Sequence, residues 1–214
     1  MLKVYSVFSS IQGESTFAGR PCGFVRLAGC PLNCIYCDTR EVCDAPGQSV
    51  SIDHILGQVS ALNMRLIEVT GGEPLAQPGA EALLTALCDA GYTVLLETSG
   101  AFPIDTIDSR VRVIMDIKCP GSGMADRMRQ KNLDCLHPTR HEVKFVVSCK
   151  EDFNWAVALS AQKKLAECAE LLVSPVWGAV SPRELASWLV RARVPMRMQL
   201  QLHKLIWPGG EENR

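Results

Sequence analysis

Short apolar runs alternate with amphipathic segments along most of the chain, and this alternation predicts the fold. Seven runs rich in β-branched and other apolar residues predict strands at 24–28, 66–70, 93–97, 112–117, 143–147, 171–174 and 196–202. Between them, helical spacing of apolar positions predicts helices at 52–62, 79–89, 153–168 and 182–193. Near-continuous apolar strands that alternate with helices predict a parallel sheet covered on its outer face.

Polar residues follow these strands at their C-terminal ends. This placement helps to decide between two possible folds, a doubly wound sheet and a barrel. In a barrel those ends converge on one mouth, where active sites are built. Eight βα units typically need about 250 residues, and this chain has 214. We therefore expect an α/β fold, a partial, shortened (βα) barrel of about six parallel strands with its active site at the strand C-terminal ends. The polar groups are Thr70–Glu73, Glu97–Gly100, Asp116 and Lys118, Ser174, and Gln199, Gln201 and His203.

Length and charge narrow the class of protein. A chain of 214 residues with a formal net charge of -1 suits a single domain, 1–214, with a substantial core. The 22 basic residues against 23 acidic ones give no basic field for a nucleic acid. No apolar run is long enough to span a membrane, and residues 1–6 lack the apolar core of a signal peptide. We expect a cytoplasmic protein whose ten cysteines are thiols or metal ligands.

The most specific chemical motif is a C-x3-C-x2-C array formed by Cys30, Cys34 and Cys37. Thiolates hold iron–sulfur clusters, and three of them leave one corner of a four-iron cluster open. A structural zinc site with Cys43 as a fourth thiolate and a redox pair of Cys34 with Cys37 are the alternatives. A second C-x2-C pair or a nearby His would favour zinc, and neither occurs. The spacing predicts a cluster, and neither Cys22 nor Cys43 fits it.

These motifs carry a resemblance to a known family. The three cysteines, Tyr36 before the third of them, and Gly71-Gly72-Glu73-Pro74 after the second predicted strand resemble the radical S-adenosylmethionine (SAM) superfamily. Within it, the chain is similar to the 7-carboxy-7-deazaguanine synthases over nearly its whole length, from about Tyr5 to Pro208. The stretches that carry this likeness are Ile11–Ser15, Phe24–Leu27, Cys37–Thr39, Glu97–Gly100, Met115–Lys118 and Gln201–Lys204.

The resemblance implies a reaction and its cofactors. In that family, 6-carboxy-5,6,7,8-tetrahydropterin becomes 7-carboxy-7-deazaguanine with release of ammonia, in queuosine biosynthesis. The implied cofactors are a [4Fe-4S] cluster, SAM and Mg²⁺. The open iron chelates the methionine part of SAM, and one electron then yields a 5′-deoxyadenosyl radical. The implied partners are a small-molecule pterin and an electron donor such as flavodoxin or ferredoxin, in a homodimer without nucleic acid or membrane.

The resemblance also implies which residues bind the cofactors. A tight turn at Gly71–Gly72 and satisfied polar caps at the strand ends are the structural alternatives. Lys118 follows an apolar run, so it needs a partner, and the SAM carboxylate would suit it. Cys30, Cys34 and Cys37 would hold the cluster, while Tyr36, Asp38, Gly72, Glu73, Ser99, Asp116, Lys118 and Ser174, within the stretch 174–178, would bind SAM.

A second set would bind the substrate and the magnesium ion. Glu14 would accept hydrogen bonds from the pterin, and Arg26 would hold the substrate carboxylate with its planar fork. Alternation along the last predicted strand would turn Gln199, Gln201 and His203 into the mouth. The alternatives are solvated side chains, a structural histidine, and a threonine bonded to its own loop. The implied substrate contacts are Ile11, Gln12, Gly13, Glu14, Arg26, Thr70, Thr98 and His203, and Thr39 is the implied Mg²⁺ ligand.

One departure from the family pattern and two rival functions remain at this point. Ser15 stands where many relatives carry glycine, and the tail at 209–214 receives no role. A glycyl-radical enzyme activase, which acts on a protein, is the nearest rival, and its mark would be an exposed docking surface. A non-catalytic zinc-binding scaffold would need Cys43, and metal analysis separates it from an iron–sulfur protein.

Overall fold

A single nine-stranded sheet organises the chain in a computed structural model that describes residues 1–208. The strand order is β3-β1-β2-β4-β5-β6-β7-β8-β9. Every neighbouring pair from β2 to β9 is parallel, whereas β1 pairs with β2 and β3 in the antiparallel sense. The strands are β1 Leu2–Ile11, β2 Pro21–Leu27, β3 Gln48–Val50, β4 Leu66–Gly71, β5 Thr93–Thr98, β6 Arg112–Lys118, β7 His141–Val147, β8 Glu170–Pro175 and β9 Arg197–Met198.

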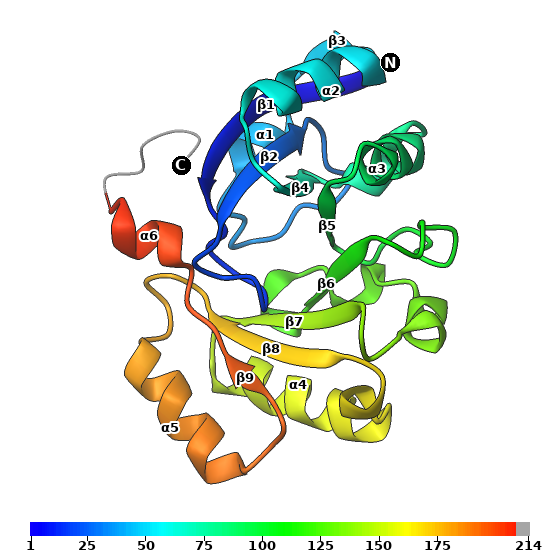
Figure 1. Cartoon of the computed structure of the whole chain (residues 1–214). Coiled ribbons are helices and arrows are strands. Elements are labelled where there is room, and N and C mark those ends of the chain that lie inside the picture. The colour runs from blue at the N-terminus through cyan, green and yellow to red at the C-terminus, as the bar shows by residue number, and fades with distance from the viewer. Residues whose placement is uncertain (209–214) are drawn as a thin grey trace.

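The sheet curves, and helices cover its outer side (Figure 1). Helices α2 to α5 lie along that side, whereas α6 lies near the other side, close to the loops that follow the strands. The predicted α/β architecture with a largely parallel sheet is therefore confirmed. The helices are α1 Arg40–Cys43, α2 Ile52–Ala61, α3 Ala80–Asp89, α4 Lys150–Gln162, α5 Pro182–Ala192 and α6 Leu202–Ile206, with short 3-10 helices at Pro74–Ala76, Pro120–Ser122, Ala125–Arg127, Gln130–Cys135 and Leu165–Glu167.

The two faces of the sheet bury different groups because successive side chains of a strand point to opposite sides. The outward-facing side chains join the helices in one large apolar core, which includes Ile67 and Val69 of β4 and Val143 and Phe145 of β7. The inner face holds a smaller apolar cluster. Its members are Cys22, Phe24, Leu66, Leu95 and Ile114, with Phe8 and Phe17 packed against them.

Two predictions about the ends of the chain are wrong. The N-terminal strand β1 was not predicted, although Leu2 and Val4 are buried and Lys3 and Tyr5 are exposed, a clear alternation. The predicted strand 196–202 is also wrong, since β9 covers only Arg197–Met198 and α6 begins at Leu202. The alternation argument for Gln199, Gln201 and His203 therefore fails.

The other predicted elements lie within a few residues of the observed ones. The largest difference is the predicted helix 153–168, which is α4 at Lys150–Gln162 followed by a separate 3-10 turn. All ten cysteines are free. Within residues 1–208, no helix has both the length and the apolar character that a membrane crossing requires. The tail at 209–214 lies outside the described residues.

Candidate active site at the strand C-terminal ends

The loop after β2 carries the three cysteines of the motif, and all three line one cavity of about 220 Å³. Backbone bonds hold this loop in place: Ile35 N donates to Ser122 O at 3.0 Å, and Cys37 N donates to Cys34 O at 3.2 Å. Burial raises the pKa of the Cys30 and Cys34 thiols. No three potential ligands within residues 1–208 are grouped to hold a single metal ion. The three thiols suit a cluster, which is larger than one ion.

Cys43 lies beside these thiols, which corrects the view that sequence spacing sets it apart. Its Sγ is 3.8 Å from Cys37 Sγ, and it lines the same cavity. Burial and the neighbouring Cys37 raise the pKa of Cys43 to about 12. Helix α1 brings it there, because its single turn folds the chain back toward the loop. A cluster held by Cys30, Cys34 and Cys37 therefore has a fourth thiol as its neighbour.

The two glycines after β4 allow that strand to meet the cysteine loop. Gly71 has a φ of 146°, and a Cβ on it would stand 2.0 Å from Leu27 O. A Cβ on Gly72 would stand 2.1 Å from Gly29 O. Both positions therefore exclude any larger residue. The sequence interpretation assigned this closeness to a ligand, whereas in the structure the glycines first admit the backbone of the cysteine loop.

Glu73 has its carboxylate fully used inside the protein. It is completely buried and accepts hydrogen bonds from Thr98 Oγ1 at 2.8 Å, from Ser99 N at 2.7 Å and from Leu75 N at 3.0 Å. Ser99 Oγ also donates to it. Glu73 thus joins the end of β4 to the end of β5 and fixes Thr98 and Ser99 at the cavity wall. Glu73 therefore shapes the pocket indirectly, because it holds Thr98 and Ser99 in position.

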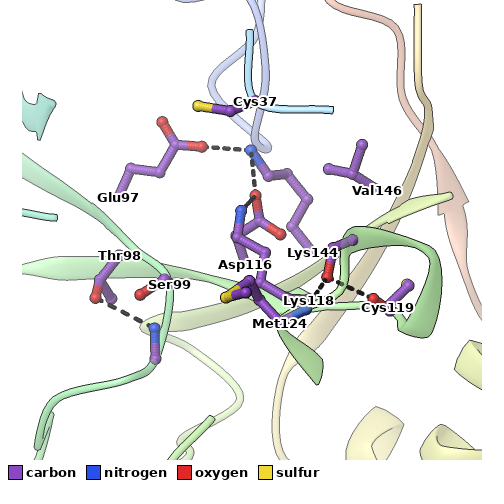
Figure 2. A network of polar contacts seen from close by, with 12 residues as sticks. Cys37, Glu97, Thr98, Ser99, Asp116, Lys118, Cys119, Met124, Lys144 and Val146 are labelled. Atoms are coloured by element: carbon purple, nitrogen blue, oxygen red, sulfur yellow. Dashed lines mark hydrogen bonds and ion pairs between the residues drawn. The ribbon is translucent and has the colours of Figure 1, made fainter. Parts of the chain in front are cut away.

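A charged network crosses the cavity floor (Figure 2). Lys144 of β7 is 3% exposed and forms ion pairs with Glu14 at 2.6 Å, with Glu97, and with Asp116 at 3.6 Å. Burial opposes the charge of Lys144, but these three carboxylates outweigh it and raise the pKa of Lys144 well above its usual value. The lysine stays charged and holds three strands and the Gly13–Ser15 loop together.

The remaining polar groups fit the methionine and ribose parts of SAM. Asp116 pairs with Lys118 at 2.9 Å, and burial is outweighed by Lys118 and Lys144, which lower the pKa of Asp116. Its Oδ1 and the Oγ of Ser174 are buried without a hydrogen-bond partner within residues 1–208. Since buried polar atoms normally find partners, Asp116 Oδ1 is free to bind a polar ligand in the cavity, whereas the predicted contact Ser174 is not among the residues that line it. The donor set therefore suits the amino, carboxylate and hydroxyl groups of that cofactor.

The predicted substrate residues of the N-terminal half meet on the inner face. Arg26 lies over the Phe8 ring at 5.7 Å, and within residues 1–208 its guanidinium has no ion pair. Thr70 Oγ1 donates to Glu97 Oε2 at 3.1 Å. Gln12 and Glu14 follow β1 and line the same cavity, as do Ile11 and Gly13. An arginine without an ion pair in the described residues and several hydrogen-bonding groups thus line one cavity.

The backbone of Ser15 adopts a conformation that suits the glycine expected at this position from the family resemblance. Its φ is 63°, in the left-handed region that favours glycine. Two bonds hold the strained residue in place: Phe17 N donates to Ser15 Oγ at 3.0 Å, and Gln199 Nε2 donates to Ser15 O at 2.9 Å. The substitution therefore preserves the turn that presents Gln12 and Glu14.

Helix α6 brings the C-terminal residues to the same cavity by a route that the strand prediction missed. Leu202 N donates to Gly13 O at 3.0 Å, and a Cβ on Gly13 would stand 2.4 Å from His203 Nδ1. His203 lines the cavity, and burial lowers its pKa. Gly13 is thus required because the imidazole packs against it. The prediction that His203 and the Gln12–Glu14 stretch share one site is correct in position but wrong in secondary structure.

Asp38, a predicted SAM contact, has its side chain directed at α6. It pairs with Lys204 at 2.7 Å and accepts from Gln201 Nε2 at 2.9 Å. Burial acts against ionisation, but Lys204 and Gln201 outweigh it and hold the pKa of Asp38 below its usual range. The same Gln201 donates to Glu14 at 2.8 Å. The cysteine loop is thereby tied to the C-terminal helix.

Two further predicted residues lie on the cysteine loop. Tyr36 donates its hydroxyl to Val146 O at 2.9 Å, which fixes the ring against β7, and it lines the cavity. Thr39 is the N-cap residue of α1 but makes no side-chain cap bond there. Its Oγ1 lies 4.0 Å from Cys37 Sγ and faces the cavity. The hydroxyl of Thr39 therefore contacts a side chain of its own loop, and within residues 1–208 it makes no hydrogen bond to the loop backbone.

The sequence interpretation missed several residues of the site. Glu68 and Lys144 lie on the inner face, and each is a charged residue inside an apolar strand, a signal that the sequence interpretation did not use at these positions. Glu97 and Lys204 stood in family-like stretches without an assigned role. Cys43 was set aside on spacing alone.

Comparison with known proteins identifies the family. A model of the radical SAM superfamily matches residues 25–120. The curated 7-carboxy-7-deazaguanine synthase of Chlorobaculum tepidum is 48% identical over 96% of this chain and 94% of its own length. The one of Koribacter versatilis is 36% identical over 96% and 97%. QueE from Escherichia coli shares the fold, with a TM-score of 0.72 and 22% identity over 94% of this chain and 93% of that one.

These matches agree with the site, where three thiols, Arg26, and polar atoms that lack a partner within residues 1–208 line one cavity. The chain belongs to the 7-carboxy-7-deazaguanine synthase family of radical SAM enzymes.

Proposed function

We propose that this chain converts 6-carboxy-5,6,7,8-tetrahydropterin into 7-carboxy-7-deazaguanine with loss of ammonia, as a carbon–nitrogen lyase of queuosine biosynthesis. The observation that supports this most is that one cavity joins both halves of the chemistry. Cys30, Cys34 and Cys37 line it together with Glu14 and Arg26. Residues 1–214 would act as a single radical SAM domain.

The cluster and SAM, when bound, supply a 5′-deoxyadenosyl radical; the protein holds and orients the reactants. Cys30, Cys34 and Cys37 would hold the cluster, and Lys118 and Asp116 would bind the charged end of SAM. Ser174, whose hydroxyl has no hydrogen-bond partner within residues 1–208, would accept or donate one more bond to the cofactor. Tyr36, Gly72, Ser99 and the backbone around Asp38 would shape that pocket.

On the substrate side, Arg26 would form charge-assisted hydrogen bonds to the pterin carboxylate. Glu14 would accept from the ring N–H and amino groups, with Gln12, Thr70 and His203 as further contacts. The ion pair of Glu14 with Lys144 at 2.6 Å fixes the direction of that carboxylate. Since Gly13 and Ile11 shape the same turn, they would position Gln12 and Glu14, while Thr98 would act from the cavity wall.

Thr39 would supply one oxygen to Mg²⁺, because this hard ion prefers oxygen ligands and keeps several waters. The substrate carboxylate would supply a second ligand. An electron donor such as flavodoxin or ferredoxin, a homodimeric assembly and a cytoplasmic location complete the proposal. Of these three, the chemistry inside the cavity requires only the electron that the donor supplies.

The direct test is turnover under anaerobic conditions. The reconstituted protein receives SAM, a chemical reductant, Mg²⁺ and the carboxypterin, and mass spectrometry follows the deazapurine. We expect product from the wild type and none from Cys37→Ala. An intact cluster that cleaves SAM but forms no deazapurine would overturn the proposal and favour the activase, whose substrate is a protein.

A further inference from the structure

Glu68 is a buried acid in the floor of the cavity that the proposed function does not use. It stands on β4 between Leu66, which packs in the inner apolar cluster, and Thr70, which lines the cavity. These three side chains share one face, since positions two apart in a strand point the same way. Glu68 is 3% exposed and lines the cavity.

The hydrogen bonds around Glu68 leave one of its oxygens free. Its Oε2 accepts from Gln12 Nε2, and this is the one side-chain hydrogen bond of Glu68 within residues 1–208, so Oε1 is left for a ligand. The two neighbouring carboxylates differ. Glu97 accepts from Lys144 and Thr70, and Glu14 accepts from Lys144 and Gln201, so both oxygens of each are bonded. Of these three glutamates, Glu68 is therefore the one that has an oxygen left for a ligand.

The charges that face Glu68 come from several elements. Glu97 of β5 and Glu14 of the loop after β1 are acidic; Lys144 of β7 and Arg26 of β2 are basic. The Cys22 thiol of β2 is a further neighbour. Burial, followed by Glu97 and Glu14, raises the pKa of Glu68 well above its usual value, while Lys144 and Arg26 act in the opposite sense. Lys144 forms its close ion pairs with Glu14 and Glu97, so the environment of Glu68 favours the neutral carboxylic acid.

We propose that Glu68 is a substrate-contact residue that presents a neutral carboxylic acid, whose O–H donates a hydrogen bond to an acceptor atom of the bound heterocycle. A carbonyl oxygen or an unprotonated ring nitrogen would satisfy it. Glu14 accepts and Arg26 binds a carboxylate, so Glu68 adds a neutral donor and selects against ligands that lack an acceptor there. The inference rests on the proposed function only for the identity of the ligand as a pterin.

Infrared difference spectroscopy tests the protonated acid directly, independent of turnover. The probe is 6-carboxy-5,6,7,8-tetrahydropterin, added to the cluster-loaded protein with SAM. At neutral pH we expect the wild type to show the carbonyl stretch of a protonated carboxyl group that Glu68→Gln lacks, and to show this band shift when the pterin binds. Glu142→Gln is the matched control, because Glu142 is also buried but does not line the cavity. That variant should keep the shift.

Binding measurements give the second test. Glu68→Gln keeps a donor of the same shape, so we expect its dissociation constant for the pterin to stay within about threefold of the wild type. Glu68→Met removes the donor and should weaken binding roughly tenfold. The proposal is overturned if no band separates wild type from Glu68→Gln, if the pterin leaves the band unmoved, or if Glu68→Met binds as tightly as the wild type. A shifted band without deazapurine product would instead overturn the proposed function and leave Glu68 in its role.

Discussion

The outer and inner faces of the same strands differ in what they bury. On β7, Val143, Phe145 and Val147 point into the large core beneath the helices, whereas Lys144 points into the charged cavity. On β6, Met115 and Ile117 join that core, and Asp116 and Lys118 face the cavity. A single strand thus serves two purposes at neighbouring residues. Packing on the outer face stabilises the fold and allows buried charge on the inner face.

This contrast has an energetic basis. Apolar burial stabilises a fold by roughly 25 cal/mol per Å², whereas buried charges contribute little net stability even when paired. The inner apolar cluster of Phe24, Leu95 and their neighbours is small, so most of the stability comes from the outer face. Substitutions on the inner face should therefore lower activity and leave stability nearly unchanged, whereas substitutions on the outer face should lower stability.

The largest expected effect on activity comes from the cysteine loop. Cys37→Ala should abolish iron–sulfur absorbance and all turnover, because one of three cluster ligands is lost. Its unfolding in the metal-free state should match the wild type, since Cys37 is only partly buried. The control is Cys88→Ala on the outer face, which should keep the visible spectrum. Turnover by Cys37→Ala with full iron content would show that the ligand assignment is wrong.

The largest expected effect on folding comes from the outer face. Phe145 is completely buried and contacts Trp155 edge-on at 6.4 Å between ring centroids. Phe145→Ala should lower the free energy of unfolding by about 3–5 kcal/mol, measured in urea on the metal-free protein. The molecules that remain folded should keep the wild-type KM for SAM. A loss below about 1 kcal/mol would contradict the contrast between the faces.

A smaller effect is expected at the substrate end of the cavity. Arg26→Gln removes a charge-assisted hydrogen bond of about 1.5–3 kcal/mol. We expect the KM for the carboxypterin to rise roughly ten- to hundredfold, while the KM for SAM stays within about threefold. Steady-state kinetics with each substrate varied in turn measures both values. An equal rise in the two constants would remove Arg26 from the substrate side.

The smallest effect is expected where α6 meets the cysteine loop. Lys204→Met removes the ion pair with Asp38, which is partly exposed and therefore worth at most about 1 kcal/mol. Because the pKa of Asp38 is lowered in the folded state, the stability gained is present above its usual value of 3.8 and is lost as the pH falls through the folded value. The difference between variant and wild type should shrink at acid pH and in high salt. A pH-independent difference would point to lost packing of α6 instead.

The sequence predicted much of this fold, because the central strands of a parallel sheet are nearly continuous apolar runs. Their C-terminal ends carry the motif residues, so the site could be located as well. The N-terminal strand β1 was not predicted because it alternates apolar with polar residues and so lacks a continuous apolar run. The segment 196–202 was wrongly predicted as a strand because its Gln and Leu residues alternate as they would in one. Its true conformation depends on contacts of Gly13 and Asp38 with α6, which only the tertiary structure brings together.

The buried charges were the harder part. A charged residue in an apolar run has to have a partner, but the sequence does not say which. Lys144 meets Glu14 and Glu97, which are 130 and 47 residues away along the chain. Cys43 lies near Cys37 because α1 turns the chain back, a contact that ligand spacing in the sequence does not reveal.

The most direct test of the central claim is the metal and sulfide content of protein purified without oxygen. We expect about four irons and four sulfides per chain for the wild type and for Cys43→Ala, with little zinc in either. Cys37→Ala should lose most of its iron. About one zinc per chain in the wild type, lost in Cys43→Ala, would contradict the cluster and with it the assignment of the cavity.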